Sequence, residues 1–194
     1  MNENISIYMV GVGGQGVLTI AELLLAAANA RGIYCNYYPT KGMAQRGGFV
    51  KAQIRLGSSE LGPEISRHGA DVVIAMELSE ALKAVDFLKP GGDMIVYGRR
   101  WLPTDVMLGK AFYPTAEDVA EEAHKVTENY RYIDPEAVNG DGNYSDNILL
   151  LAAAREHTAI GRMFSAEELS AAVAERFPKG AERNTASFEA GQKA

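Results

Sequence analysis

The first thirty residues constrain the fold of this chain most, because they have the pattern of a strand, a glycine-rich turn and a helix. Residues 5–10 form a short apolar run rich in β-branched and aromatic residues, as a buried strand requires. The glycines within residues 11–16 end that strand. Residues 17–30 then repeat apolar side chains at three- and four-residue spacing, which predicts a helix with one buried face.

The rest of the chain continues to alternate between strand and helix patterns. Further strands are expected at residues 33–38, 49–56, 71–76, 94–97 and 131–133. Helices are expected at residues 81–88, 115–126 and 147–155, and after a capping box that begins at Ser165. Pro39 is expected to end the second strand, and Pro90 with its two following glycines the helix before it. This alternation predicts an α/β fold with a mainly parallel sheet and a helical C-terminal segment.

The chain has 194 residues, which is enough for one generous domain. We find no internal repeat and no linker, so we expect a single domain over residues 1–194. From Lys179 onward the periodicity is weak. An extended tail is expected there, either loose or wrapped around a partner.

Composition excludes several classes of function. The net charge of −6 argues against nucleic-acid binding, which normally uses a basic stripe. No apolar run approaches the ~20 residues that span a bilayer, and the N-terminus lacks a signal-peptide pattern. The single cysteine, Cys35, excludes an internal disulfide and points to the reducing cytoplasm. It also means that this chain alone cannot ligate an iron–sulfur cluster, which needs about four thiolates.

The glycine-rich turn has the GxGxxG pattern of an anion-binding loop. One glycine permits the tight turn, one lets a phosphate approach the backbone, and one lets helix and strand pack closely. The free amides and the dipole of the following helix favour negative charge. The alternative is a tight turn without a ligand. A nicotinamide dinucleotide would require an acidic residue ~20 positions on, and residues 36–41 contain none.

A second loop strengthens the prediction of an anion site. Residues 40–48 (TKGMAQRGG) follow the second strand and should therefore lie at the same sheet edge as the first loop. Arg46 would bind a phosphate bidentately, Lys41 would act as a mobile charge, and Thr40 would add a hydroxyl. The alternative is a solvated basic turn.

Other candidates are weaker. The sequence Gly-Asp-Gly-Asn at residues 140–143 begins like a thiamine-diphosphate motif but lacks the later asparagine, so a polar turn is the better interpretation. His68, His124 and His157 have no neighbours at metal-ligand spacing, and we assign no metal ligand. Cys35 is expected to be a small core residue. Glu77 is either functional, because it follows a strand, or a helix cap.

The motifs together resemble the gamma-type domain of 2-oxoacid:ferredoxin oxidoreductases. The resemblance is carried by GVGGQGVLT (residues 11–19), YPTKGMAQRGG (38–48) and residues 70–92, and continues at residues 147–151, 164–168 and 184–191. The second loop is most similar to that of the small subunit of indolepyruvate:ferredoxin oxidoreductase. The resemblance covers nearly the whole chain and implies a Rossmann-like three-layer domain.

The resemblance implies an accessory subunit that carries no catalytic residue. Enzymes of this family decarboxylate a 2-oxoacid on thiamine diphosphate, pass electrons through iron–sulfur clusters to ferredoxin, and release an acyl-coenzyme A. It further implies that thiamine diphosphate, Mg²⁺ and the clusters lie on a larger partner subunit, whereas coenzyme A meets this chain's two loops. The implied contacts are Gly11, Gly13, Gly14, Gln15, Gly16, Thr40, Lys41, Arg46, Gly47 and Gly48.

The sequence is also compatible with two other functions. One is a stand-alone oxidoreductase that binds NAD or FAD, which the missing acidic residue disfavours. The other is a structural assembly module whose glycine loop is only a tight turn.

Overall fold

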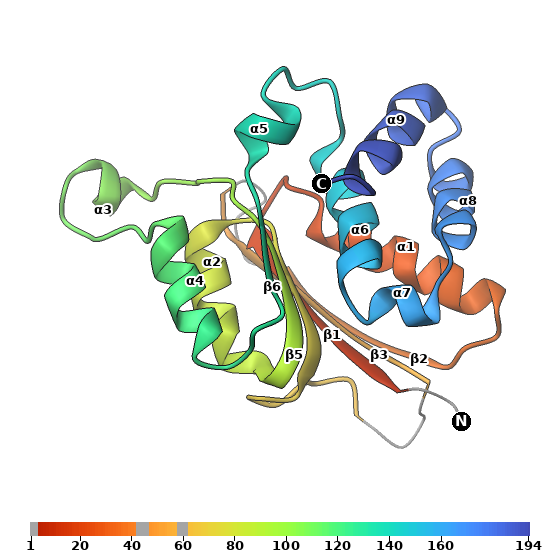
Figure 1. Cartoon of the computed structure of the whole chain (residues 1–194), viewed down its shortest axis with the longest axis horizontal. Coiled ribbons are helices and arrows are strands. Elements are labelled where there is room, and N and C mark those ends of the chain that lie inside the picture. The colour runs from red at the N-terminus through yellow and green to blue at the C-terminus, as the bar shows by residue number, and fades with distance from the viewer. Residues whose placement is uncertain (1–3, 42–46, 58–61) are drawn as a thin grey trace.

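A mixed sheet, six-stranded in the part of the chain that is described, forms the centre of the protein (Figure 1). The computed structural model describes residues 4–41, 47–57 and 62–194. The strands are β1 (Ile5–Val12), β2 (Cys35–Lys41), β3 (Phe49–Leu56), β4 (Ala70–Ala75), β5 (Leu88–Tyr97) and β6 (Tyr130–Ile133). Their order in the sheet is β2-β3-β1-β4-β5-β6. Strands β1, β4, β5 and β6 pair in parallel, as predicted, whereas β3 is antiparallel to both of its neighbours.

The second strand differs from the prediction, because Pro39 does not end it. Strand β2 begins at Cys35 and continues through Pro39 to Lys41. Proline is tolerated here because β2 is the edge strand, where a residue needs a partner on one side only. Pro39 lies opposite Ala52 of β3.

Helices cover both faces of the sheet, which confirms the three-layer prediction (Figure 1). Helices α1, α6, α8 and α9 pack on one face, and α2 and α4 on the other. The bounds are α1 (Val17–Ala30), α2 (Leu78–Ala84), α3 (Thr104–Met107), α4 (Ala116–His124), α5 (Pro135–Asn139), α6 (Asp146–His157), α7 (Ile160–Met163), α8 (Ala166–Arg176) and α9 (Ala181–Gly191), with a 3-10 helix η1 (Val85–Phe87). In the described residues, no helix is both long and apolar enough to traverse a bilayer.

The larger apolar core lies between the sheet and the layer of α1, α6, α8 and α9. Helix α1 has the predicted bounds and buries Ile20, Leu23 and Leu24. Helix α6 is buried on all sides along residues 148–154, because it packs on the sheet and is itself covered by α9. This arrangement positions the first turn of α6 beside the glycine turn that precedes α1.

Two sequence boundaries around β5 were wrong. The helix predicted at residues 81–88 begins at Leu78, and β5 begins at Leu88 rather than at residue 94. Pro90 and the two glycines after it therefore lie inside the strand. They are accommodated by a bulge, since Ala70 pairs with Leu88 but Val72 pairs with Asp93.

The C-terminal residues fold back as helix α9, so the prediction of an extended tail was wrong. Helix α9 packs on α6 so closely that a Cβ atom at Gly191 would lie 2.8 Å from Cβ of Ala152. The predicted capping box is present at the start of α8, where the hydroxyl of Ser165 accepts from Glu168 N at 3.2 Å. The carboxylate of Glu168 accepts from Ser165 N in return.

Candidate functional site

The glycine turn after β1 has a geometry that requires glycine. Gly14 and Gly16 have φ angles of 100° and 91°, in the left-handed region that other residues rarely adopt. A Cβ atom at Gly11 would lie 2.7 Å from Oε1 of Gln15 and 3.1 Å from Cβ of Met76. The turn is therefore tight, and its glycines are needed whether or not a ligand binds.

Gln15 closes the turn from within. Its backbone N–H donates to Val12 O at 3.1 Å, and its side-chain Oε1 accepts from Val12 N at 2.7 Å. The carbonyl end of the side chain is thus used by the turn. The amide Nε2 is the part of Gln15 that can meet a ligand.

The second loop returns to the first at residues 47 and 48. Gly13 N donates to Gly48 O at 2.8 Å. Gly47, with a φ of 79°, lies against the indole of Trp101, where a Cβ atom would come within 3.1 Å of the ring. The two loops therefore meet at one sheet edge, as predicted. They meet because the second loop leads into β3, which lies between β1 and β2 and starts at the edge where β1 ends.

The side chains of the two predicted cations of this loop are not among the described parts of the structure. Arg46 is outside the described residues, and of Lys41 only the backbone, at the end of β2, is described. Thr40 pairs with Lys51 in the β2–β3 hairpin and does not line the cleft described next.

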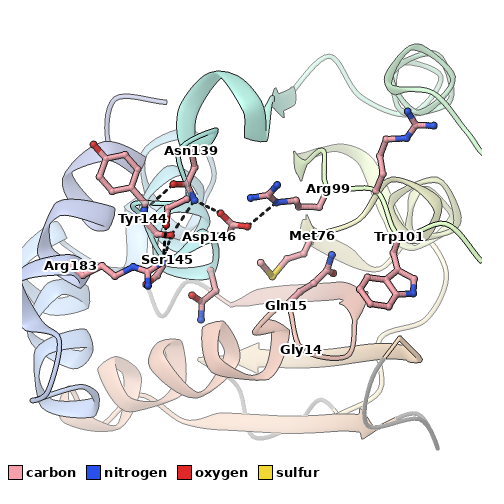
Figure 2. A pocket seen from close by; sticks show the side chains of 13 residues that line it. Gly14, Gln15, Met76, Arg99, Trp101, Asn139, Tyr144, Ser145, Asp146 and Arg183 are labelled. Carbon is pink, nitrogen blue, oxygen red and sulfur yellow. Dashed lines mark hydrogen bonds and ion pairs between the residues drawn. The ribbon is translucent and has the colours of Figure 1, made fainter.

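A cleft of about 500 Å³ opens beside the glycine turn, at the carboxyl ends of β1, β4 and β5 (Figure 2). In open α/β sheets this edge is where ligands bind. Gly14, Gln15 and Met76 form its floor near the turn, and the segment after β5 and the start of α6 form its walls. The lining residues are Gly14, Gln15, Met76, Arg99, Arg100, Trp101, Asn139, Gly142, Tyr144, Ser145, Asp146, Asn147 and Arg183.

The cleft is basic although the chain is acidic. Its described lining contains three arginines, Arg99, Arg100 and Arg183, against one carboxylate, Asp146. Nη2 of Arg183 donates to the backbone oxygens of Gly142 and Tyr144, at 3.2 and 2.9 Å. Arg99 is paired with Asp146 and, at 3.5 Å, with Glu136, so the positive charge that attracts anions comes mainly from Arg100 and Arg183.

Asp146 organises one wall of the cleft (Figure 2). It accepts from Arg99 Nε at 2.9 Å, from Tyr97 Oη at 2.7 Å and from Asn139 Nδ2 at 2.5 Å. Burial alone would raise the pKa of Asp146, but these three donors hold it below its ordinary value. Burial and the bond to Asp146 together raise the pKa of Tyr97 well above the ordinary value. The carboxylate is therefore ionised and committed to positioning Arg99.

Two helix N-termini meet in the cleft. Helix α1 starts after Gly16, and a Cβ atom there would lie 2.6 Å from Nδ2 of Asn147 in the first turn of α6. Ser145, which precedes α6, is held by α9: its N–H donates to Ser187 Oγ at 2.8 Å, and its hydroxyl donates to Asn184 Oδ1 at 3.1 Å. The positive ends of both helix dipoles thus add to the arginines.

Glu77 caps helix α2 and also holds the segment that follows β5. It accepts from Glu80 N at 2.9 Å at the start of α2, and also from the hydroxyls of Ser79 and Tyr113 and from Trp101 N. Its side chain is fully buried. It thereby fixes the segment after β5 that carries Arg99, Arg100 and Trp101.

The other candidate residues from the sequence have no functional partner in the described structure. In the described residues, no three His, Cys, Asp or Glu side chains are close enough to hold a metal ion. Cys35 packs at the border of the larger core, and burial raises the pKa of its thiol. Residues 140–143 form a turn at the rim of the cleft, as the sequence predicted.

Sequence reasoning missed most of the cleft wall. Arg99, Arg100 and Trp101 follow β5 directly, so the rule that applies to the glycine turn, that ligands bind after parallel strands, could have found them. Asp146 carried a weaker signal, a polar residue before an apolar helix. Arg183 carried no signal, because α9 was not predicted.

Comparison with known proteins decides the family. Residues 6–194 match the pyruvate ferredoxin/flavodoxin oxidoreductase family. The chain belongs to this family. The resemblance inferred from its motifs is thereby confirmed, and with it membership in a group of oxidoreductase subunits.

Individual relatives agree with this assignment. The IorB subunit of indolepyruvate oxidoreductase from Pyrococcus horikoshii is 32% identical over 193 residues, covering 97% of this chain and 95% of that subunit. The Archaeoglobus fulgidus IorB subunit is 41% identical over 123 residues, covering 63% of this chain and 61% of its own length. A gamma subunit common to pyruvate and ketoisovalerate oxidoreductases of Thermococcus kodakarensis is 28% identical over 182 residues, or 89% and 90% of the two chains.

Solved structures confirm the fold. The PORC subunit of pyruvate oxidoreductase from Thermotoga maritima superposes with a TM-score of 0.69 at 17% identity, over 98% of this chain and 94% of that one. A 2-oxoglutarate:ferredoxin oxidoreductase from Magnetococcus marinus, solved with 2-oxoglutarate, coenzyme A and succinyl-CoA bound, also gives 0.69 at 20% identity. It covers all of this chain but only 31% of the longer one.

Proposed function

We propose that this chain is the accessory subunit of an indolepyruvate or other aryl-pyruvate:ferredoxin oxidoreductase, and that its glycine-turn edge faces coenzyme A. Family membership makes the chain a subunit of a 2-oxoacid:ferredoxin oxidoreductase. The near full-length similarity to the Pyrococcus horikoshii IorB subunit supports the indolepyruvate branch. The basic cleft beside the glycine turn is the observation that supports the coenzyme A edge.

The chemistry of coenzyme A suits this edge. Its diphosphate and ribose phosphate are anions, which arginines and helix N-termini bind well. Of the ten contacts expected from the loops, Gly14 and Gln15 line the cleft, and we add Arg99, Arg100 and Arg183 from its walls. A related enzyme was solved with coenzyme A bound, which makes this ligand the first to test.

The strand order weighs against NAD, the first alternative. In dinucleotide-binding folds the second strand lies beside the first and brings an acidic residue to the ribose. Here β3 lies between β1 and β2, so β2 lies two strand spacings from β1, or about 9.6 Å, instead of one. The second alternative, a turn without a ligand, is consistent with the way Gln15 closes the turn, and only binding data separate it from the proposal.

The remaining chemistry is assigned to partners. We propose that a larger subunit carries thiamine diphosphate with Mg²⁺ and the iron–sulfur clusters, since this chain has one cysteine. Ferredoxin would meet the complex through those clusters. This chain would position coenzyme A and supply no group to the chemical step.

The test uses the enzyme reconstituted from this chain and its larger subunit. The double substitution Lys41→Ala with Arg46→Ala should raise KM for coenzyme A at least tenfold, because hydrogen bonds to charged groups contribute about 1.5–3 kcal/mol each. KM for the 2-oxoacid should stay within about twofold, because the substitutions remove phosphate contacts and leave the subunit that carries thiamine diphosphate unchanged.

The matched control removes two exposed cations elsewhere, Arg67→Ala with Lys125→Ala, whose partners are the surface carboxylates Asp86, Glu121 and Glu122. If KM for coenzyme A were the same in both double variants and the wild type, the coenzyme A edge would be abandoned and a turn without ligand preferred.

A further inference from the structure

A projecting arm, residues 102–112, leaves the α/β body between β5 and α4 (Figure 1). It contains the short helix α3, which buries none of its residues. In Figure 1 the arm stands outside both helical layers, beyond α2 and α4. Of its side chains, Val106 packs against the smaller core at the α2 and α4 face, and the rest of the arm extends away from it.

The arm is apolar where it is exposed. Nine large apolar side chains of the described residues are exposed; four of them lie in the arm, and a fifth, Trp101, lies at its root. The exposed fractions reach 66% for Met107, 60% for Leu108 and 75% for Phe112. Scattered exposed apolar residues are ordinary, but a cluster on one projecting segment marks an interaction surface.

Hydrogen bonds at the base of the arm hold its two ends together and fix the direction in which it projects. Trp101 N, on one side of the arm, donates to the hydroxyl of Tyr113 on the other at 3.1 Å. That hydroxyl donates in turn to the buried carboxylate of Glu77, and Trp101 N lies 3.3 Å from the same group. Burial and the bond to Glu77 raise the pKa of Tyr113, so the hydroxyl keeps its proton. A buried, hydrogen-bonded base fixes the direction in which the arm projects.

The arm is continuous with the cleft. Trp101, at its root, lines the cleft together with Arg99 and Arg100 and lies against Gly47 of the second loop. Any chain that covers the arm therefore also reaches the rim of the candidate site.

We propose that the arm docks into an apolar groove of the larger subunit and brings that subunit to the mouth of the cleft. This rests on the proposed function, because it takes the larger subunit as the partner. The arm carries one acid, Asp105, and one base, Lys110, so it lacks the positive charge that membranes or nucleic acids attract. Its eleven residues are fewer than the 20–30 per side of a stable interface, so arm-to-arm pairing of two copies would be too small. A larger subunit can cover the arm and the cleft rim together.

The experiment measures binding of this chain to the immobilised larger subunit of its complex. Met107→Ser with Phe112→Ser should raise the apparent Kd at least tenfold, because a few well-packed anchor residues carry most of the binding energy of an interface. The control, Tyr34→Ser with Tyr38→Ser, removes two exposed aromatic rings at the β2 edge and should change Kd less than twofold. Thermal melting should be unchanged in both variants, because surface substitutions of this kind have small effects on stability.

Two results would overturn the arm proposal. One is an unchanged Kd for the arm variant. The other is a wild-type chain that forms a homodimer in solution and loses it on the arm substitutions, which would assign the arm to self-association. At saturating larger subunit, the arm variant should regain the wild-type KM for coenzyme A. The KM for coenzyme A of the Lys41 and Arg46 double variant tests the coenzyme A edge, and the Kd of the arm variant tests the arm. A wild-type chain that did not bind the larger subunit would refute the subunit role itself, so the three outcomes are distinguishable.

Discussion

Asp146 is the residue on which the geometry of the cleft depends most. It joins β5 through Tyr97, the following segment through Arg99 and helix α5 through Asn139. It accepts three hydrogen bonds while lying in the first turn of α6, where the helix dipole also favours a negative charge. The sequence could not reveal this, because the three donors are brought together only by the fold.

Replacing Asp146 by Asn should lower the free energy of unfolding by about 1–3 kcal/mol at pH 7, because charge-assisted hydrogen bonds are lost. The folded-state pKa of Asp146 is depressed, so its stabilisation is present above the ordinary pKa of about 3.9 and is lost as pH falls through the folded value. The difference between wild type and D146N should therefore shrink below about pH 4. Urea unfolding from pH 7 to pH 3 measures this.

The control for Asp146 is Glu128→Gln, at a carboxylate that is 92% exposed, which should change stability by less than about 0.5 kcal/mol at any pH. A D146N penalty that did not depend on pH would contradict the ionic role and leave only a packing effect.

At the scale of elements, α9 supports the candidate site by holding helix α6 in position. It covers α6, and its Asn184 and Ser187 hold Ser145 at the start of that helix. Gly191 permits the close approach, since a Cβ atom there would lie 2.8 Å from Cβ of Ala152. The position of α6, and therefore of Asp146 and Asn147, depends on this contact.

Gly191→Ala should destabilise the chain by about 1–3 kcal/mol through overpacking, although alanine is the better helix former by about 1 kcal/mol. Thr185→Ala, at an exposed position of the same helix, adds helix propensity without touching α6 and should be neutral or slightly stabilising. Urea unfolding of the two variants gives the comparison. A stabilised Gly191→Ala variant would mean that the α6–α9 contact is looser than the structure indicates.

Elements set by local patterns were predictable, and those set by tertiary context were not. Helix α1 and strand β3 match their predicted bounds, because apolar periodicity and turn residues specify them locally. Pro39 and residues 90–92 were misread as ends because an edge position and a bulge, which no local pattern encodes, tolerate them. Helix α9 was missed because its apolar face is narrow, with Ser187, Phe188 and Gly191 as its buried residues.

At the scale of the whole molecule, strand order determines which ligand the glycine turn can serve. The sequence suggested a dinucleotide fingerprint, and the missing acid after the second strand was the first argument against NAD. Topology adds a second, independent argument. Strand β3 occupies the place beside β1 where a dinucleotide-binding fold would bring its ribose-binding acid.

The reconstituted enzyme should therefore distinguish coenzyme A from NAD⁺ at this site. Desulfo-coenzyme A, which keeps every phosphate but lacks the reacting thiol, should compete with coenzyme A, whereas 1 mM NAD⁺ should leave KM for coenzyme A within about twofold. A dinucleotide site with a Kd of about 100 μM would raise that apparent KM about elevenfold, because the factor is one plus the ratio of ligand concentration to Kd. Competition of that size by NAD⁺ would restore the dinucleotide interpretation, since the two ligands would then share the turn after β1.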